Sequence, residues 1–327
     1  MRPPVLITGG AGFIGYHLAR YHCQLGDSVV LLDNCFKNEG KVDQSFQELI
    51  TEPNIQFILT DLTQSLLDIN VGKEFSIVYH LAAINGTRLF YEMPFEVAST
   101  NLLSTLNLLE WFQSKSADRL VYASTSEVYA DAGELGLLNI PTNEETPVVF
   151  TQPTKVRFSY GASKFMGEFL CLQFGKKSNV PTSVVRYHNI YGPRMGNKHV
   201  IPEFIARMEK NEKPFRIYGG NETRAFCYID DAVEATYRVA TTSSCENEII
   251  HIGNSDEEIS IESLAKLMMG RLGKESEILE CGGRSGSVSR RCPDVSKLQR
   301  LTGFKARINL KEGLSRTLDW YLSRSAL

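Results

Sequence analysis

The sequence has few of the features of a membrane protein or of a secreted, disulfide-linked protein. No stretch of its 327 residues approaches the roughly 20 consecutive apolar residues that a membrane-spanning helix needs. The opening MRPPVLITGG lacks the charged, apolar and small-residue regions of a cleavable signal. Seven cysteines occur without one C-x-x-C pair, which indicates reduced thiols and no structural zinc. We therefore expect a cytoplasmic protein with no membrane contact and no metal.

A marked excess of charge is also missing. The formal net charge is −3, which does not fit the basic footprint of a nucleic-acid-binding protein. Apolar residues make up 43% and charged residues 22%, as in ordinary globular proteins. A chain of this length exceeds what one hydrophobic core usually supports. We expect one large domain with a smaller lobe, and no nucleic acid as partner.

The N-terminal half alternates short apolar runs with helical patterns. Helical spacing of apolar residues predicts helices at residues 13–25, 94–114 and 163–175. Apolar runs predict strands at residues 5–8, 28–32, 55–59, 77–81, 119–123 and 183–186. Strands that are apolar throughout and alternate with helices predict a parallel sheet covered on both faces. The fold class is therefore α/β, with a Rossmann-type doubly wound parallel sheet.

The pattern loosens from about residue 187, where glycine and proline interrupt it. Residues 228–241 and 249–253 look regular enough to return to the first domain. We therefore expect a Rossmann-type domain over residues 1–186, with 228–253 returning to it. Residues 187–227 and 254–327 are expected to form a smaller, interleaved α/β lobe.

A glycine-rich turn between the first strand and first helix indicates a dinucleotide site. The segment V-L-I-T-G-G-A-G-F-I-G contains a G-x-G-x-x-G array, and one further glycine precedes it. Glycines let the backbone turn tightly and approach a pyrophosphate, which then lies at the positive end of the helix. The residues expected to contact the dinucleotide here are Gly9, Gly10, Gly12, Phe13, Ile14 and Gly15.

An acidic residue at the end of the second strand selects the cofactor. Asp33 lies 18 residues (33 − 15) past the last glycine, near the ~20 that is usual. Its carboxylate would accept hydrogen bonds from ribose hydroxyls and repel a 2′-phosphate, so we expect NAD rather than NADP. Lys37 is a nearby charge that would weaken this preference. Asp61 and Leu62 would meet the adenine, or Asp61 would only cap a helix.

Several motifs resemble those of a known family. The segments T-G-G-A-G-F-I-G, H-L-A-A, S-T-S-E-V-Y, Y-G-A-S-K and R-Y-H-N-I-Y-G-P follow in family order, and R-A-F-C-Y-I-D-D and R-R-C-P-D extend the match. The chain resembles the extended short-chain dehydrogenase/reductases, and within them the NAD-dependent nucleotide-sugar epimerases, dehydratases and decarboxylases. The resemblance implies NAD as cofactor, a nucleotide-diphosphate sugar as substrate and a homodimer through the two long helices. Further expected NAD contacts are Asn34, Leu81, Ala82, Ala83, Asn101, Tyr160 and Lys164.

Tyr160 and Lys164 are the expected catalytic pair. They stand i, i+4 apart, so a helix would place them on one face. A phenol with a pKa of about 10 is a poor base at neutral pH, but a neighbouring ammonium and the nicotinamide cation would lower that pKa. Tyr160 would then take the proton of a sugar hydroxyl while the carbon gives hydride to NAD. The alternative is an exposed helix face.

Three polar residues complete the expected site. By resemblance, the Thr125 hydroxyl would hydrogen-bond the same sugar oxygen as Tyr160. Ser126 would assist it or cap the turn. Asn101 matches a family position that organises the active site, and otherwise reads as a helix-surface amide.

Glu127 bears on the outcome of the reaction. Many epimerases of the family have a small residue there, whereas dehydratases and decarboxylases have Glu. Once C4 is a ketone, a carboxylate could remove the C5 proton or assist loss of CO2 from a C6 acid. The alternative is a salt bridge or a turn contact.

Lys155 and Arg157, just before Tyr160, would meet an acidic sugar substituent or be solvated.

The second lobe supplies candidate ligands for a diphosphate. Asn189 matches a family position that bonds the diphosphate or the sugar. Arg224, with Arg290 or Arg291, offers guanidinium groups whose planar fork suits phosphate oxygens. Each arginine taken singly is more often a solvated surface charge.

We expect an NAD-dependent enzyme that oxidises C4 of a nucleotide-linked hexose to a transient ketone. Epimerisation is the leading outcome, and decarboxylation or dehydration through Glu127 is the alternative. A reductase of free alcohols or ketones is a second enzyme class. A dinucleotide-binding sensor without activity is the non-enzymatic alternative.

Overall fold

The computed structural model describes residues 2–36, 40, 42–197, 199–282 and 288–325, so Lys37 lies outside the described residues. The chain divides into two compact units. The first comprises Met1–Val128, Phe150–Arg186 and Val233–Ile250, and the second comprises Tyr129–Val149, Tyr187–Ala232 and His251–Leu327. The sequence analysis assigned residues 129–149 and 228–253 to the first domain. In the structure, residues 129–149 belong to the second unit, and residues 233–250 belong to the first.

A seven-stranded sheet organises the first unit. Its order is β13-β8-β7-β5-β1-β2-β3, and the pairings from β7 to β3 are parallel. The strands are β1 (Val5–Thr8), β2 (Val29–Asp33), β3 (Ile55–Leu59), β5 (Ile77–His80), β7 (Leu120–Thr125), β8 (Thr182–Tyr187) and β13 (Ile249–Ile252). β1, β5 and β7 are buried along their whole length, which explains why their sequences are apolar up to the polar residues at their carboxyl ends. The expected Rossmann-type doubly wound sheet is confirmed.

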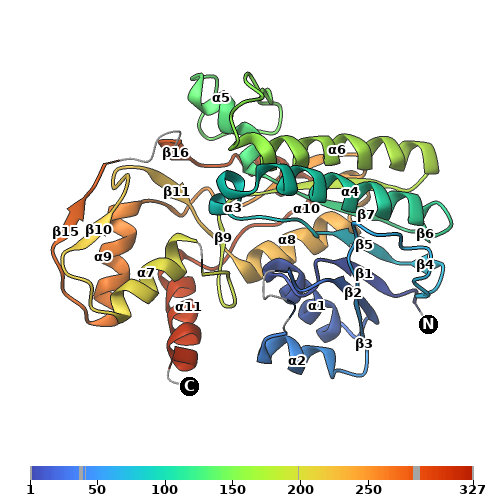
Figure 1. The fold of residues 1–327 in the computed structure, drawn as a ribbon, viewed down its shortest axis with the longest axis horizontal. Helices are drawn as coiled ribbons and strands as arrows, with labels where there is room; N and C mark the ends of the chain where they lie inside the picture. The colour runs from blue at the N-terminus through green and yellow to red at the C-terminus, as the bar shows by residue number, and fades with distance from the viewer. Residues whose placement is uncertain (1, 37–39, 41, 198, 283–287, 326–327) are drawn as a thin grey trace. The chain divides into compact units, whose positions relative to one another are not determined.

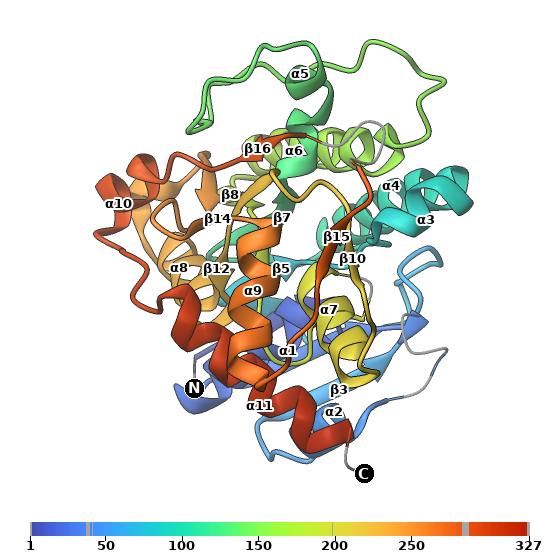
Figure 2. The same ribbon diagram turned by 90° about the vertical axis from the view of Figure 1, so that its left-hand side faces the viewer.

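Helices cover both faces of this sheet. α1 (Phe13–Gln24) and α2 (Gln44–Ile50) lie on one side, and α4 (Pro94–Phe112) and α6 (Phe158–Ser178) lie side by side on the other (Figures 1 and 2). The chain order reverses at β1, whose neighbours are β2 and β5. The carboxyl ends of parallel strands share one edge, and ligands bind beside such a reversal. The turns after β1, β2, β5 and β7 therefore define the edge where a site is expected.

Short elements complete the two units. The first unit also contains β4 (Glu74–Phe75), α3 (Thr87–Glu92), β6 (Ser116–Ala117), the 3₁₀ helices η2 (Ser126–Tyr129, of which only the first three residues belong to this unit) and η3 (Ser243–Cys245), and most of α8 (Ile229–Thr241). The second contains α5 (Ala130–Glu134), β9 (Ile190–Tyr191), α7 (Val200–Glu209), β10 (Phe215–Ile217), β11 (Thr223–Ala225), β12 (Cys227–Tyr228), β14 (Glu258–Ser260), α9 (Ile261–Leu272), β15 (Ile278–Glu280), β16 (Arg290–Arg291), α10 (Ser296–Thr302) and α11 (Leu310–Ser325).

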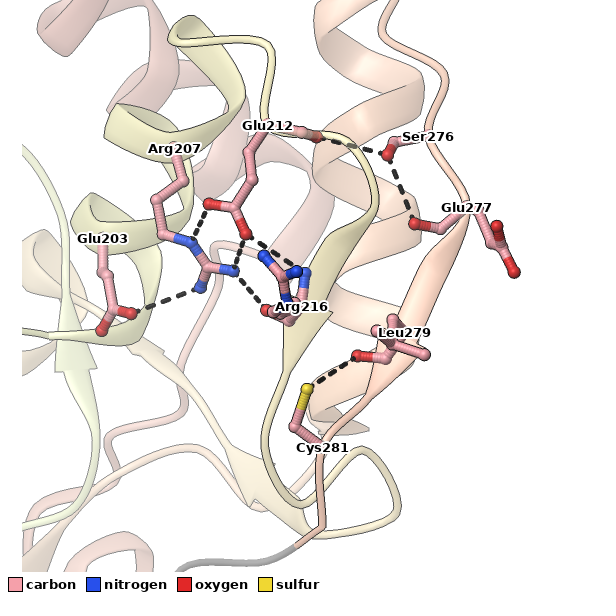
Figure 3. A network of polar contacts seen from close by, with 8 residues as sticks. All are labelled: Glu203, Arg207, Glu212, Arg216, Ser276, Glu277, Leu279 and Cys281. Atoms are coloured by element: carbon pink, nitrogen blue, oxygen red, sulfur yellow. Dashed lines mark hydrogen bonds and ion pairs between the residues drawn. The ribbon is translucent and has the colours of Figure 1, made fainter.

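Polar contacts around Arg207 join α7 to β10 in the second unit (Figure 3). The Arg207 guanidinium donates to both carboxylate oxygens of Glu212, at 2.8 and 2.9 Å, and also to the carbonyl of Arg216. Arg207 lowers the pKa of Glu212 to about 2. β10 in turn pairs in parallel with β15. An ion pair and a strand pairing thus order this part of the lobe.

Among the described residues, no helix is both long and apolar enough to cross a membrane.

Candidate active site

The glycine-rich turn leaves no room for side chains. Gly9 has a φ of +72°, and a Cβ placed there would lie 2.8 Å from the Ala82 nitrogen. A Cβ on Gly10 would lie 2.9 Å from the Leu31 Cβ. α1 begins directly after Gly12, with no acidic residue in its first turn. A tight turn leading into an uncapped, positive helix end fits the pyrophosphate of a dinucleotide.

Asp33 is held beside this turn. Its Oδ2 accepts a hydrogen bond from the Ala11 nitrogen at 3.0 Å, and its Oδ1 accepts one from the Cys35 nitrogen at 2.7 Å. The carboxylate thus stands at the end of β2, where the ribose of a bound NAD would lie. Asn34, next to it, accepts a bond from the Phe36 nitrogen at 3.0 Å.

Asp61 has a local role in its turn. Its Oδ1 accepts from the nitrogen and the hydroxyl of Thr63, at 2.9 and 2.8 Å, and the residue is exposed. Leu62 beside it is buried. These bonds close a turn, and since no helix begins in the fully described segment between β3 and β4, Asp61 is not the helix cap given as the alternative. An adenine contact stays a prediction.

The segment after β5 is tied to the glycine turn and to two helices. The Leu81 and Ala82 nitrogens donate to the carbonyl and hydroxyl of Thr8, at 3.1 and 3.3 Å. Asn101 of α4 is 2% exposed, so it is not a helix-surface amide. Its Oδ1 accepts from the Ile84 nitrogen at 2.8 Å, and its Nδ2 donates to the Ser163 hydroxyl at 3.2 Å. Asn101 thereby joins the segment that contains Ala83 to α6.

Tyr160 lies within α6, because the helix begins at Phe158 rather than at the expected residue 163. Its ring stacks on Phe90 of α3, with centroids 4.8 Å apart and planes 8° from parallel. Sequence analysis did not identify Phe90. The phenol hydrogen-bonds to the side chain of Thr125, at the end of β7. The expected hydroxyl pair therefore meets at the carboxyl edge of the sheet.

The pKa of Tyr160 is raised, opposite to the direction expected from a neighbouring ammonium. Burial of the phenol is the main cause, and the Glu127 carboxylate adds to it. The hydrogen bond from Thr125 acts in the other direction. A role for Tyr160 as a base would therefore require positive charge near the phenol that offsets its burial.

Lys164 lies one turn further along α6 and is 2% exposed. Its Nζ stands 4.1 Å from the centroid of the Tyr122 ring. Burial lowers the pKa of Lys164 to about 8, while Cys171 and Glu168 partly oppose the shift. The ammonium is thus held on the buried side of α6, and its protonation is sensitive to pH near neutrality.

A buried network below this pair was not foreseen from the sequence. Glu168 accepts from Arg186 at 2.8 and 2.6 Å, and also from the Ser124 hydroxyl. All three side chains are buried. They link β8, α6 and β7, one residue before Thr125 and one helical turn after Lys164. Arg186, directly after two valines in β8, was the signal that could have revealed the network.

Glu127 lies in η2, directly after Thr125 and Ser126. Its backbone nitrogen donates to the Thr125 hydroxyl at 3.2 Å, and its Oε2 lies 3.5 Å from Nη2 of Arg157. The salt-bridge alternative for Glu127 is therefore observed, together with closeness to the Tyr160 phenol. Ser126 is half-buried at the start of the same turn, and its role stays a prediction.

The second unit brings some of the expected phosphate ligands together. β11 pairs in parallel with β16, with Arg224 opposite Arg291. Residues opposite each other in a sheet share a face. The side chains of Arg224 and Arg291 therefore leave the backbone at neighbouring positions on one face. Asn189 donates to the carbonyl of Ala225 at 3.2 Å, next to Arg224.

Two of these arginines already have carboxylate partners. Arg224 donates to Glu222 at 2.7 Å. Arg290 forms a two-point contact with Glu258, at 2.7 and 2.8 Å, and lowers the pKa of Glu258 to about 2. Of the pair Arg290 and Arg291, the strand register favours Arg291 as the companion of Arg224.

Metal-ligand geometry is not found in the part of the chain that the structure describes. No group of three or more His, Cys, Asp or Glu side chains that could hold a metal ion gathers there.

Comparison with known proteins places the chain among nucleotide-sugar enzymes. A UDP-N-acetyl-alpha-D-glucosaminuronate decarboxylase of Bacillus cytotoxicus is 34% identical, over 98% of each chain. A putative UDP-glucose 4-epimerase of Methanocaldococcus jannaschii is 31% identical over 97% of each. The crystal structure of UDP-glucuronic acid 4-epimerase from Bacillus cereus with UDP-glucuronic acid and NAD has a TM-score of 0.83 at 28% identity, covering 98% of this chain and 99% of that one.

A family model covers most of the chain as well. Residues 5–253 match the model of the NAD dependent epimerase/dehydratase family. The match includes the glycine turn, Thr125, and both Tyr160 and Lys164. The chain therefore belongs to the NAD dependent epimerase/dehydratase family.

Proposed function

We propose that this protein is an epimerase of nucleotide-diphosphate sugars that oxidises C4 of the hexose to a transient ketone. The observation that carries the proposal is the meeting of Tyr160 and Thr125 at the carboxyl edge of the sheet, with the glycine turn at the same edge. Bound NAD would accept the C4 hydride and return it to the opposite face. Asp33 would hold its ribose, and Gly9, Gly10 and Gly15 would admit its pyrophosphate.

In this proposal the side chains of the site bind the C4 oxygen and transfer its proton. Thr125 and Tyr160 would hydrogen-bond the C4 oxygen, and the phenol oxygen would take its proton as the ketone forms. The buried Lys164 ammonium would supply positive charge on the same helix. Arg224 and Arg291, with Asn189, would bind the diphosphate.

Decarboxylation is a second candidate, favoured by the position of Glu127 beside Tyr160. A C6 carboxylate is β to a C4 ketone, so the C5–C6 bond can break as CO2 leaves. The electron pair would pass to the C4 oxygen, where Thr125 and Tyr160 would stabilise it, and the ketone would be restored as C5 takes up a proton. Return of the hydride to C4, with the proton from Tyr160 to the C4 oxygen, would then leave a product lighter by CO2 alone. The first-named relative above is a decarboxylase.

Product analysis tests both candidates. The purified protein is incubated with UDP-, GDP- and dTDP-sugars, and the products are analysed by mass spectrometry and chromatography. An epimerase yields an isobaric product, and a decarboxylase yields a product lighter by CO2. Tyr160→Phe should slow turnover by at least about 100-fold, whereas Tyr91→Phe, at a half-exposed ring, should not. Full activity of Tyr160→Phe would contradict the proposal.

We also propose that the protein is a homodimer, and its cytoplasmic location stays a prediction. Apolar side chains stand exposed on the neighbouring helices α4 and α6, with Phe95 at 77% and Phe169 at 56%. Such a patch suits a symmetric contact with a second copy. The exposed residues are Phe95, Leu103, Leu106, Phe165, Met166 and Phe169.

Sedimentation velocity tests the dimer. Phe169→Glu should convert it to a monomer, whereas Leu67→Glu, exposed outside these helices, should leave it unchanged. A wild-type protein that sediments as a monomer would refute the dimer.

A further inference from the structure

Two cations precede Tyr160, and the structure gives them different surroundings. The Lys155 ammonium lies 5.2 Å from the centroid of the Phe158 ring. Arg157 immediately precedes α6, and its Nη2 lies 3.5 Å from Oε2 of Glu127. The Arg157 and Glu127 side chains are only 15% and 21% exposed. Arg157 is therefore paired with a carboxylate whose charge acts on the Tyr160 phenol.

The position of Arg157 relates it to one part of a bound hexose. Tyr160 follows Arg157 by one helical turn, and Glu127 is close enough to influence the phenol. If the phenol serves the C4 oxygen, the carbons beyond C4 lie next to it. C6 is joined to C4 through C5, so a substituent on C6 falls within reach of the same pair of side chains.

Charge then distinguishes two kinds of hexose. A neutral C6 hydroxymethyl group can donate to Glu127 and needs no cation. A C6 carboxylate would be repelled by Glu127 unless a positive charge stood between them. A guanidinium has five N–H donors in a planar fork, so Arg157 can keep its contact with Glu127 and donate to a second carboxylate. That contact, at 3.5 Å, is longer than a tight charge-assisted hydrogen bond.

We propose that Arg157 binds the C6 carboxylate of a nucleotide-linked hexuronic acid and so selects acidic over neutral sugars. The proposal rests on the proposed function at the same site and holds for either outcome of the reaction. It assigns Arg157 a specificity role and Lys155 none.

Steady-state kinetics with a matched pair of substrates tests this assignment. UDP-glucuronic acid and UDP-glucose serve as probes for wild type, Arg157→Gln, Arg157→Lys and Lys155→Gln. Arg157→Gln should lower kcat/KM for the acid by on the order of 30-fold, because a partly buried charge pair is lost. The same variant leaves Glu127 without its cation beside the phenol, so UDP-glucose should also lose some turnover, and the assignment requires the acid-to-neutral ratio of kcat/KM to fall by about tenfold. Arg157→Lys should fall between, and Lys155→Gln should match wild type.

Several results would overturn the assignment. Equal losses for both sugars in Arg157→Gln, with lowered thermal stability, would indicate a structural role, and Arg157→Lys would then show the same pattern. A selective loss in Lys155→Gln would transfer the role to that residue. If wild type converts neither sugar, the inference is tested separately from the proposed function, by calorimetric binding of the same two sugars. Arg157→Gln must then weaken binding of the acid by at least about tenfold more than binding of UDP-glucose.

Discussion

The carbonyl oxygen of Glu127 packs against Gly161, the residue that follows Tyr160 in α6. A Cβ on Gly161 would lie 2.8 Å from this oxygen, so no other residue fits without a shift of the helix or of η2. The close approach holds Tyr160 beside the turn that contains Thr125 and Glu127. Gly161, which lies between Tyr160 and Lys164 in the sequence, thus sets the distance between α6 and η2.

Gly161→Ala should therefore impair both folding and catalysis. Overpacking at this contact is expected to cost about 1–3 kcal/mol of unfolding free energy, measured by urea titration, and to lower kcat. The matched control is Gly270→Ala in α9, where no atom lies within 4 Å of the new Cβ. That variant should be neutral or stabilised by up to about 1 kcal/mol. Wild-type turnover in Gly161→Ala would contradict this account of the contact.

Asp33→Asn should weaken the preference for NAD over NADP. The substitution removes the charge that repels a 2′-phosphate and disturbs the bond to the Ala11 nitrogen. We expect NADH to bind about tenfold more weakly, from loss of a charged hydrogen bond, and NADPH to bind better relative to NADH. Fluorescence titration with both dinucleotides measures this. Asp118→Asn, at an exposed aspartate, is the control. An unchanged ratio in Asp33→Asn would refute the assigned role.

Glu168→Gln should destabilise the first unit strongly. The substitution leaves Arg186 buried without its carboxylate, which costs about 3–5 kcal/mol. Asp319→Asn removes one partner of the exposed Arg271–Asp319 pair and should cost less than about 1 kcal/mol. Chemical denaturation of the three proteins compares these values. A double variant, Glu168→Leu with Arg186→Met, should recover part of the loss. Equal stability of Glu168→Gln and wild type would show that the pair contributes nothing.

His80 should make the fold sensitive to acid. Its Nδ1 contacts the Thr8 hydroxyl at 2.7 Å and its Nε2 the Thr105 hydroxyl at 3.0 Å, and burial followed by the Lys164 charge lowers its pKa to about 3. Between that value and the ordinary 6.5 the unfolded chain binds more protons, so stability falls as the pH falls through this window. The slope approaches about 1.4 kcal/mol per pH unit.

Urea titrations between pH 7 and pH 4 measure this slope. His80→Asn should remove the part of the pH dependence of stability that comes from His80. The carboxylates and the remaining histidines still titrate in this variant. The difference between the two proteins isolates the effect. Identical slopes would show that His80 does not titrate differently on folding.

Much of the fold could be predicted from the sequence because its signals are local. The strands Val5–Thr8 and Ile55–Leu59 begin and end at the expected residues. Val5–Thr8 lies inside the parallel sheet and is buried throughout, whereas Ile55–Leu59 is the edge strand β3 and is mostly apolar, with Gln56 exposed. The glycine turn and the position of Asp33 at the end of β2 could be located for the same reason, since both depend on short spacings within one βαβ unit, and their contacts with a dinucleotide stay predictions. The motifs also identified the family.

The start of α6 and the grouping of residues 129–149 were predicted less well. α6 begins at Phe158 rather than at residue 163, because Phe158 and Tyr160 pack inward and extend the helix beyond its periodic part. Residues 129–149 group with the second unit, although they follow a strand of the first in the chain. Their contacts are with residues distant in sequence, such as Cys292, whose carbonyl accepts from the Thr142 nitrogen. No local pattern reports such a contact.

The sequence by itself determined the sheet and located the glycine turn, and it supplied Tyr160 and Lys164 as the predicted reacting pair. Only the tertiary structure decided the charges around that pair. Burial and Glu127 raise the pKa of Tyr160, Arg157 pairs with Glu127, and Glu168 joins Arg186 to Ser124. Burial and electrostatic interaction depend on distances between elements far apart in the chain, whereas strand and turn signals depend on neighbours. The burial and the charges at the site can therefore be determined only from the packed structure.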